Sequence, residues 1–152
     1  MLRVLDVIKK NGNNIHSISS HKMAYTALEI MAEKDIGALM VIDGRELVGI
    51  FSERDYARKV ILRGKSSKDT TVGELMTTPV FSIHPKKSIE ECMALMTASR
   101  SRHVPVIESG TLLGIISMGD IVNELIIAQK IAVEDLKKYI AGGEHASEWS
   151  AS

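Results

Sequence analysis

The fold is decided by two stretches of sequence, VIDGRELVGIFSERD at residues 41–55 and VIESGTLLGIISMGD at residues 106–120. A shift of 65 residues superposes them, and seven of the fifteen positions are then identical. The likeness extends upstream, where Ile18 falls on Ile83. A long internal repeat of this kind indicates that one structural unit occurs twice. We therefore assign residues 1–64 to a first copy and residues 72–125 to a second, with a polar linker between them.

Each copy combines a helical pattern with two strand patterns. Apolar side chains recur at helical spacing in residues 24–31 and 89–96. The second of these helices is preceded by Ser88 and Glu91, which have the spacing of a capping box. Two short apolar runs separated by a glycine-containing turn follow in each copy, and this pattern is typical of a β-hairpin. The sequence therefore predicts an α/β (α+β) fold built from two pseudo-symmetric β-α-β-β-α repeats.

Composition and charge argue against several classes of protein, namely nucleic-acid-binding, membrane-spanning and secreted proteins. The chain has 152 residues, with 19 basic and 19 acidic side chains and no net charge. A neutral chain gives no support for binding a nucleic acid polymer, because such binding depends on excess positive charge. No apolar run approaches the ~20 residues that span a bilayer, so no membrane partner is predicted. The beginning of the chain lacks the apolar segment of a secretory signal, and we predict a soluble, cytoplasmic protein.

The sequence predicts an amphipathic helix that extends past the second copy. Residues 126–141 are amphipathic, and an apolar stripe runs from Leu125 to Ile140 with charges between its members. Residues 142–152 are polar and rich in small side chains, and we predict that they are disordered. Because an exposed apolar stripe needs a cover, the helix predicts a homodimer.

The strand-to-helix junction of both copies carries the motif Ser-x-x-Asp, at Ser52 and Asp55 and again at Ser117 and Asp120. One interpretation is helix capping, with the serine as N-cap and the aspartate in the first helical turn. The other is that the aspartate faces a groove between the repeats, where its carboxylate accepts both hydroxyl groups of a ribose. The two interpretations are compatible, because the cap also fixes the direction of the aspartate.

A second polar feature lies at the start of a predicted buried strand. Arg102 and His103 stand where long polar side chains are not expected, and they form either a solvated strand end or a phosphate-binding site. Pro105 in the same strand indicates an edge position or an opening in the sheet, where backbone groups left unpaired can bind the edge of a purine. The first copy has Gly37 and Ala38 instead of the basic pair, so the two grooves are predicted to be chemically unequal.

Other reactive residue types are given structural interpretations or left open. The basic side chains of Arg54, Arg58 and Lys59 form either a solvated helix face or phosphate contacts. Cys92 lies in an apolar helical stripe and is interpreted as a core residue rather than a nucleophile. The histidines lack metal-ligand spacing, and neither a Walker loop nor a GxGxxG motif is present. The sequence therefore predicts no catalytic site, no metal and no enzyme activity.

Taken together, these motifs resemble tandem CBS domains, the cystathionine-β-synthase-type repeats that are also inserted in inosine monophosphate dehydrogenases. The resemblance covers about residues 4–125, and GIFSERDYARK at residues 49–59 is similar to stand-alone bacterial CBS-pair proteins. It implies a pseudo-twofold Bateman module that often dimerises into a flat disc. It also implies adenosyl ligands, such as AMP, ADP, ATP, NAD(H) or S-adenosylmethionine, in the clefts between the repeats.

The resemblance also implies roles for individual residues. The two Ser-x-x-Asp motifs would contact ribose, the basic pair would reach phosphate, and Ile18 and Ile83 would sandwich the adenine. Arg102 would serve either the cleft of Asp55 or that of Asp120, and in both cases one cleft has a phosphate-binding arginine that the other lacks. The predicted ligand-binding residues are Ile18, Gly37, Ala38, Ser52, Arg54, Asp55, Ser82, Ile83, Arg102, His103, Val104, Pro105, Ser117, Gly119 and Asp120.

The function that these expectations favour is a regulatory sensor that binds AMP or an NAD(H)-type ligand. The nucleotide would be a ligand and not a catalytic cofactor, and its binding would be passed to an unidentified regulated protein or to the protein's own oligomer. The alternative is an interaction and oligomerisation scaffold whose clefts stay unoccupied.

Overall fold

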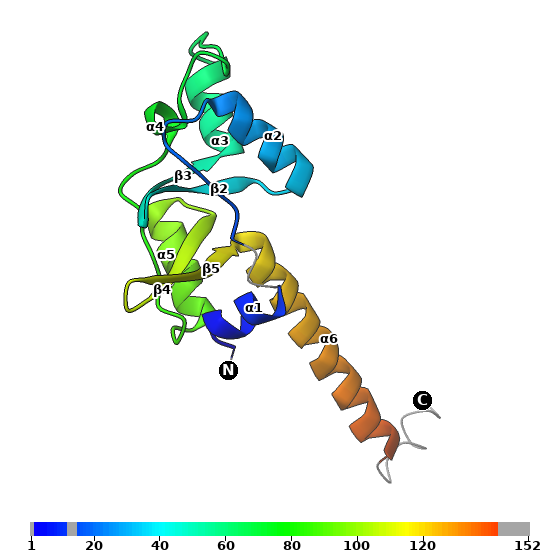
Figure 1. The fold of residues 1–152 in the computed structure, drawn as a ribbon. Helices are drawn as coiled ribbons and strands as arrows, with labels where there is room; N and C mark the ends of the chain where they lie inside the picture. Colours follow the sequence, from blue (N-terminus) through cyan, green and yellow to red (C-terminus); the bar gives the residue numbers. More distant parts are fainter. Residues whose placement is uncertain (1, 12–14, 143–152) are drawn as a thin grey trace.

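The computed structural model describes residues 2–11 and 15–142, and it confirms a mixed α/β fold with two repeats (Figure 1). The elements in chain order are α1 (Val4–Lys10), β1 (Ser17–Ile18), α2 (Ala24–Lys34), β2 (Ala38–Asp43), β3 (Glu46–Ser52), α3 (Glu53–Tyr56), the π-helical segment η1 (Ala57–Ile61), α4 (Val72–Leu75), α5 (Ile89–Ser99), β4 (His103–Glu108), β5 (Thr111–Ser117) and α6 (Met118–Gly142).

The hairpins of the two repeats have the same register. In the first, β2 pairs antiparallel with β3, and Ala38 lies opposite Ser52. In the second, β4 pairs antiparallel with β5, and His103 lies opposite Ser117. Each ladder has one register irregularity at the equivalent position. The 65-residue shift found in the sequence therefore relates the strand pairing of the two units as well.

The strand that leads into each hairpin is formed unequally. In the first repeat β1 pairs parallel with β2, and Ile18 lies opposite Val41. In the second repeat the equivalent contact is a single parallel bridge between Ile83 and Val106. The first sheet consequently has three strands and the second has two.

The two repeats exchange their leading helices. Val7 and Ile8 of α1, at the beginning of the chain, are buried in the apolar core of the second repeat with Val104. Leu75 of α4, from the segment between the repeats, is buried in the core of the first with Phe51. Figure 1 shows α1 beside β5 and α6, and α4 beside the first sheet. Neither repeat therefore completes its core with its own leading helix.

This exchange predicts that a small change in α1 affects the stability of the whole module. Ile8 is 4% exposed, and Ile8→Val is expected to lower the free energy of unfolding by about 0.5–1.5 kcal/mol, because a buried methylene group is lost. Ile131→Val, at a residue that is 56% exposed, is the matched control and is expected to have little effect. Denaturant unfolding measures both. Equal stability of the two variants would show that α1 does not contribute to the shared core.

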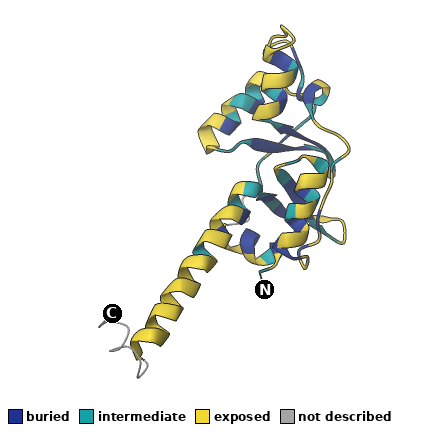
Figure 2. Ribbon diagram, turned by 180° about the vertical axis from the view of Figure 1, so that it is seen from behind, coloured by how far each residue is buried: buried dark blue, intermediate teal, exposed yellow. Residues whose placement is uncertain are grey.

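The last helix extends well beyond the second repeat. α6 is one uninterrupted helix from Met118 to Gly142, so the predicted helix at residues 126–141 is its outer part. Figure 2 shows nearly all of this outer part in the colour of exposed residues. The predicted disordered tail, apart from Gly142, lies outside the described residues. Among the helices that the structure describes, none is both long enough and apolar enough to cross a membrane.

Candidate ligand-binding cleft

The Ser-x-x-Asp motif of the first repeat forms a capping box at the start of α3. The Oγ of Ser52 accepts a hydrogen bond from the backbone N–H of Asp55 at 3.2 Å. In return, the backbone N–H of Ser52 donates to Oδ2 of Asp55 at 2.9 Å, and its hydroxyl lies 3.0 Å from the same oxygen. The capping interpretation of this motif is therefore confirmed.

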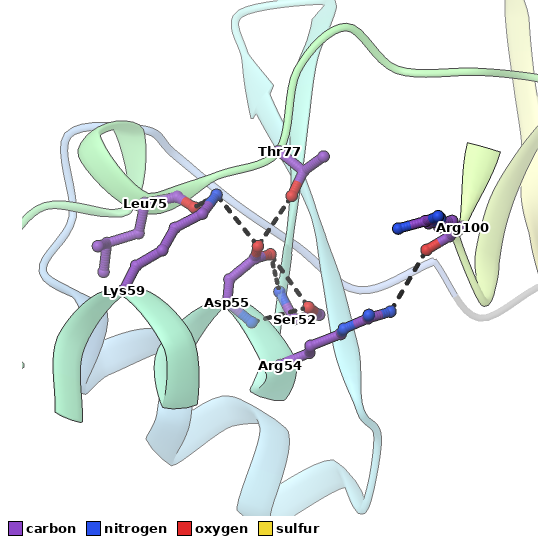
Figure 3. A network of polar contacts seen from close by, with 7 residues as sticks. All are labelled: Ser52, Arg54, Asp55, Lys59, Leu75, Thr77 and Arg100. Carbon is purple, nitrogen blue, oxygen red and sulfur yellow. Dashed lines mark hydrogen bonds and ion pairs between the residues drawn. The ribbon is translucent and has the colours of Figure 1, made fainter. Parts of the chain in front are cut away.

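The other carboxylate oxygen of Asp55 contacts two further elements (Figure 3). The hydroxyl of Thr77 donates to Oδ1 at 2.8 Å, and Nζ of Lys59 lies 3.2 Å from the same oxygen. Nζ of Lys59 also donates to the carbonyl of Leu75 at 2.9 Å. Asp55 is only 8% exposed, so these contacts hold its carboxylate in one orientation between α3 and the segment that follows α4.

The second motif has the same cap in different surroundings. The backbone N–H of Ser117 donates to Oδ2 of Asp120, and the backbone N–H of Asp120 donates to Oγ of Ser117, both at 3.0 Å. The residue equivalent to Lys59, however, is Glu124, which is buried and lies 3.2 Å from Nζ of Lys10. A cation in the first repeat is thus replaced by an anion in the second.

A pocket of about 670 Å³ lies beside the first motif and is built from both repeats. Its volume falls in the range of small-molecule binding sites. Repeat 1 contributes the start of α3, repeat 2 contributes the end of α5 and the start of β4, and the connecting segment supplies Thr77 and Phe81. The lining residues are Gly37, Ile50, Ser52, Glu53, Arg54, Asp55, Arg58, Lys59, Thr77, Pro79, Val80, Phe81, Arg100, Ser101, Arg102 and His103.

The pocket is positively charged although the whole chain is neutral. Five of its lining side chains are Lys or Arg and two are acidic, which leaves an excess of three positive charges with His103 neutral. The guanidinium of Arg54 spans the two repeats, because its Nη1 lies 3.4 Å from the carbonyl of Arg100 (Figure 3). Clefts of one sign concentrate ligands of the opposite sign, and an arginine fork suits phosphate oxygens. The pocket is therefore chemically suited to an anionic ligand.

His103 lies where the two repeats meet. A Cβ atom on Gly37 would lie 3.7 Å from Nε2 of His103 and 3.9 Å from Oε2 of Glu53, so the imidazole lies beside Gly37 of the first repeat. Burial lowers the pKa of His103 below its ordinary value, and Arg102 acts in the same direction. The carboxylates of Asp120 and Glu53 oppose this pKa shift. His103 therefore lines the pocket, and its pKa also depends on the carboxylate of Asp120 in the second motif.

Six of the fifteen predicted binding residues line this pocket, namely Gly37, Ser52, Arg54, Asp55, Arg102 and His103. The others lie elsewhere. Ile18 and Ile83 are buried beside their hairpins, and Ala38, Val104 and Pro105 are buried within β2 and β4. Ser82 and Gly119 are exposed, and Ser117 and Asp120 are partly exposed at the second cap.

One expectation about Pro105 needs correction. The sequence suggested that the backbone around this residue is left unpaired and can bind the edge of a purine. In the structure the carbonyl of Pro105 accepts a hydrogen bond from the N–H of Ile83 at 3.0 Å. That carbonyl is occupied because the short segment at Ile83 takes the place of a neighbouring strand.

Two of the contributions to the pocket that were not predicted come from outside the duplicated motif. Thr77, Pro79, Val80 and Phe81 come from the segment between α4 and Ile83, and Arg100 follows the last turn of α5. These residues stand outside the duplicated motif, so the repeat alone does not point to them. The signal that the sequence does contain is Phe81, one of only two phenylalanines, in a stretch without helix or strand periodicity.

The interpretation of Cys92 can be compared directly with the structure. Cys92 is fully buried in the second core, and burial raises the pKa of its thiol to about 11, which confirms its interpretation as a core residue. Within residues 2–11 and 15–142 no three His, Cys, Asp or Glu side chains are grouped as metal ligands.

The duplicated hairpins, the exchanged helices and the charged pocket between the repeats define a class of paired-repeat, ligand-binding modules. The family model for the CBS domain matches residues 4–61 and again residues 72–127. The chain therefore belongs to the CBS-domain family, as a CBS-pair module of the kind that is generally regulatory and ligand-binding.

Similar proteins and structures agree with this membership. The chain is 35% identical over 149 residues to the CBS domain-containing protein CBSX3, mitochondrial, of Arabidopsis thaliana, covering 92% of this chain and 72% of that one. A protein with CBS domains from Burkholderia ambifaria MC40-6 is 48% identical, with a TM-score of 0.78 over 83% of this chain and 93% of that one. A hexameric CBS-CP12 protein from bloom-forming cyanobacteria is 28% identical, with a TM-score of 0.74 over 96% and 91% of the two chains.

Proposed function

We propose that the chain is a regulatory, non-enzymatic sensor that binds an adenine nucleotide, AMP or an NAD(H)-type ligand, in the pocket between its repeats. Binding would be passed to a regulated protein partner or to a second copy of the chain. The sensor is a soluble, cytoplasmic protein in this proposal, and it needs no metal.

The observation that carries this proposal is that one pocket contains both a fixed carboxylate and an excess of positive charge. Asp55 lies on the first repeat, whereas Arg102 and His103 lie on the second. A carboxylate can accept hydrogen bonds from sugar hydroxyls, and arginine can donate to phosphate. Phe81, which is 50% exposed at the pocket, offers an aromatic surface for a base. A ligand that has base, sugar and phosphate satisfies all three features.

The proposal is tested by calorimetric titration of the purified chain with AMP, NAD⁺, NADH and adenosine. We expect saturable binding of at least one phosphorylated adenine ligand, and weaker binding of adenosine. Arg45→Ala is the matched control variant, because Arg45 is exposed in the turn between β2 and β3 and does not line the pocket. This variant is expected to bind like the original chain. Mass spectrometry of molecules that co-purify identifies the nucleotide. Absence of binding at millimolar concentration would overturn the proposal.

A second function, that of an interaction scaffold with unoccupied clefts, is favoured by one observation. The outer part of α6 carries exposed apolar side chains such as Leu136, which is 59% exposed, and Tyr139, which is 80% exposed. A scaffold is expected to associate with its partner whether or not nucleotide is present. A sensor is expected to change that association when nucleotide is added.

A further inference from the structure

No part of the module that the structure describes covers the outer half of α6. Every residue from 128 to 142 is exposed, and Figure 1 shows this part of the helix extending away from both repeats. The inner part is different, because Ile121 is fully buried and Glu124 is 5% exposed. A solitary helix of about 15 residues is only marginally stable in water, and helices in proteins gain most of their stability by packing an apolar face. The outer half of α6 therefore needs a packing partner to be a stable helix.

One face of α6 has the spacing of a coiled-coil seam. Six positions separated alternately by three and four residues lie along it, and a row of β-branched residues lies directly beside them. We name this face the α6 seam; its members are Val122, Leu125, Gln129, Ala132, Leu136 and Tyr139, flanked by Ile126, Val133 and Ile140. Nearly all of these side chains are apolar, which is the pattern that pairs two helices through interlocking side chains. Ile131, by contrast, is apolar and exposed but lies off the seam.

The charges at the two edges of the α6 seam indicate the partner and its direction. Neighbouring residues on a helix are about 100° apart, so Asp135 and Lys137 lie on opposite sides of Leu136. Lys130 lies on the same edge as Lys137, seven residues before it. In a parallel two-fold pair of helices, the acidic edge of one copy faces the basic edge of the other. In an antiparallel pair like edges meet, and the like charges repel.

Gln129 gives a second, independent argument for the parallel direction. It is the one polar side chain among the six positions of the α6 seam. In a parallel pair Gln129 faces Gln129 of the other copy, and the two amides can donate to and accept from each other. In an antiparallel pair it faces an apolar residue and its amide loses hydrogen bonds to water. A single polar position of this kind fixes the register of paired helices.

We propose that the α6 seam pairs in parallel with the α6 seam of a second copy, so that the two modules lie at the same end of the helix pair. A self-complementary face of this kind suits an identical partner. The edges carry both signs of charge, so the seam lacks the basic excess that binds a membrane surface or a nucleic acid. The proposal does not depend on nucleotide binding, and the test below is carried out without added nucleotide.

The pairing is tested first by light scattering at micromolar concentration. The original chain is expected to have twice the mass of one chain, which is 16.7 kDa. Leu136→Asp is expected to halve the measured mass, because it places a carboxylate in the middle of the seam of both copies. Ile131→Asp makes the same kind of change at a residue of nearly equal exposure, 56% against 59%, and is expected to leave the mass unchanged. A monomeric original chain, or equal masses for the two variants, would overturn the proposal.

The direction is tested by disulfide cross-linking of single-cysteine substitutions under mild oxidation. In a parallel pair each seam residue meets itself, so Ala132→Cys and Tyr139→Cys are both expected to form linked dimers. Lys138→Cys, which points away from the seam, is expected to form few. Cys92 is fully buried and does not compete. In an antiparallel pair only one crossing position can link to itself, so failure of either Ala132→Cys or Tyr139→Cys to cross-link would rule out the parallel arrangement.

Discussion

Replacing Asp55 by alanine is expected to weaken binding of AMP about ten- to a hundredfold. The expectation follows from the loss of a charged hydrogen-bonding partner, which typically contributes about 1.5–3 kcal/mol. Asp55 is 8% exposed at the pocket, and Ser52, Thr77 and Lys59 fix the direction of its carboxylate. Such a fixed acceptor binds a ribose without the cost of ordering the side chain. Calorimetric titration measures the change in affinity.

The contacts of Asp55 also show which of its neighbours competes with the sugar. A carboxylate has about four acceptor positions, and Ser52, Thr77 and Lys59 already use them. A ribose hydroxyl must therefore replace one of these partners. Thr77 lies in the connecting segment, and its hydroxyl has the same chemistry as the sugar hydroxyl that would replace it. We expect Thr77→Val to bind AMP as well as the original chain or better, whereas Asp55→Ala binds it worse.

A control must separate ligand binding from helix capping. Asp55→Ala also removes half of the capping box at α3, so some stability is lost whatever the role of the pocket. Asp120→Ala removes the equivalent half-cap, and it tests whether the second motif also binds nucleotide. Both variants are titrated at a temperature where circular dichroism shows them folded. Unchanged affinity in both folded variants would leave capping as the sole role of the aspartates.

The repeated fold could be predicted because local sequence determines it. The spacing of apolar residues and the glycine-containing turns set the hairpins, and their register repeats after 65 residues as the sequence does. The exchange of α1 and α4 could not be predicted in the same way. Val7 and Leu75 show by their pattern that each helix has a buried face, but not which of two similar sheets covers it. That choice depends on how the two units dock.

The residues of the candidate site could be predicted only in part, for a similar reason. Ser52, Asp55, Arg102 and His103 stood out because they combine a repeated motif with polar groups at a strand end. Thr77 and Arg100 did not, because a connecting segment and the end of a helix carry no periodic signal. They reach the pocket only through the packing of one repeat on the other. The alignment of the repeats places Glu124 at the position of Lys59. Only the structure shows that Glu124 pairs with Lys10.

The inequality of the two motifs leads to the second large expected effect, at Arg102. This residue is exposed at the start of β4 and lines the same pocket as Asp55 of the other repeat. If its guanidinium binds phosphate, the pocket prefers AMP over adenosine by about ten- to a hundredfold, which corresponds to about 1.5–3 kcal/mol for a charged hydrogen bond. Arg102→Ala is expected to remove most of this preference and to leave adenosine binding nearly unchanged, because adenosine has no phosphate for the arginine to bind.

The clefts are expected to differ because the second cleft lacks the equivalents of Arg102 and Lys59, which line the pocket at Asp55. The residue of the first repeat that is equivalent to Arg102 is Gly37, and Glu124 replaces Lys59 near Asp120. Glu124 is paired with Lys10 and offers no positive charge to a phosphate, so any site there should discriminate less between AMP and adenosine. Titrations of the original chain, Arg102→Ala and the control Arg45→Ala with both ligands measure this. Two equivalent sites, or an Arg102→Ala variant that keeps the full preference for AMP, would contradict the assignment of Arg102 to phosphate.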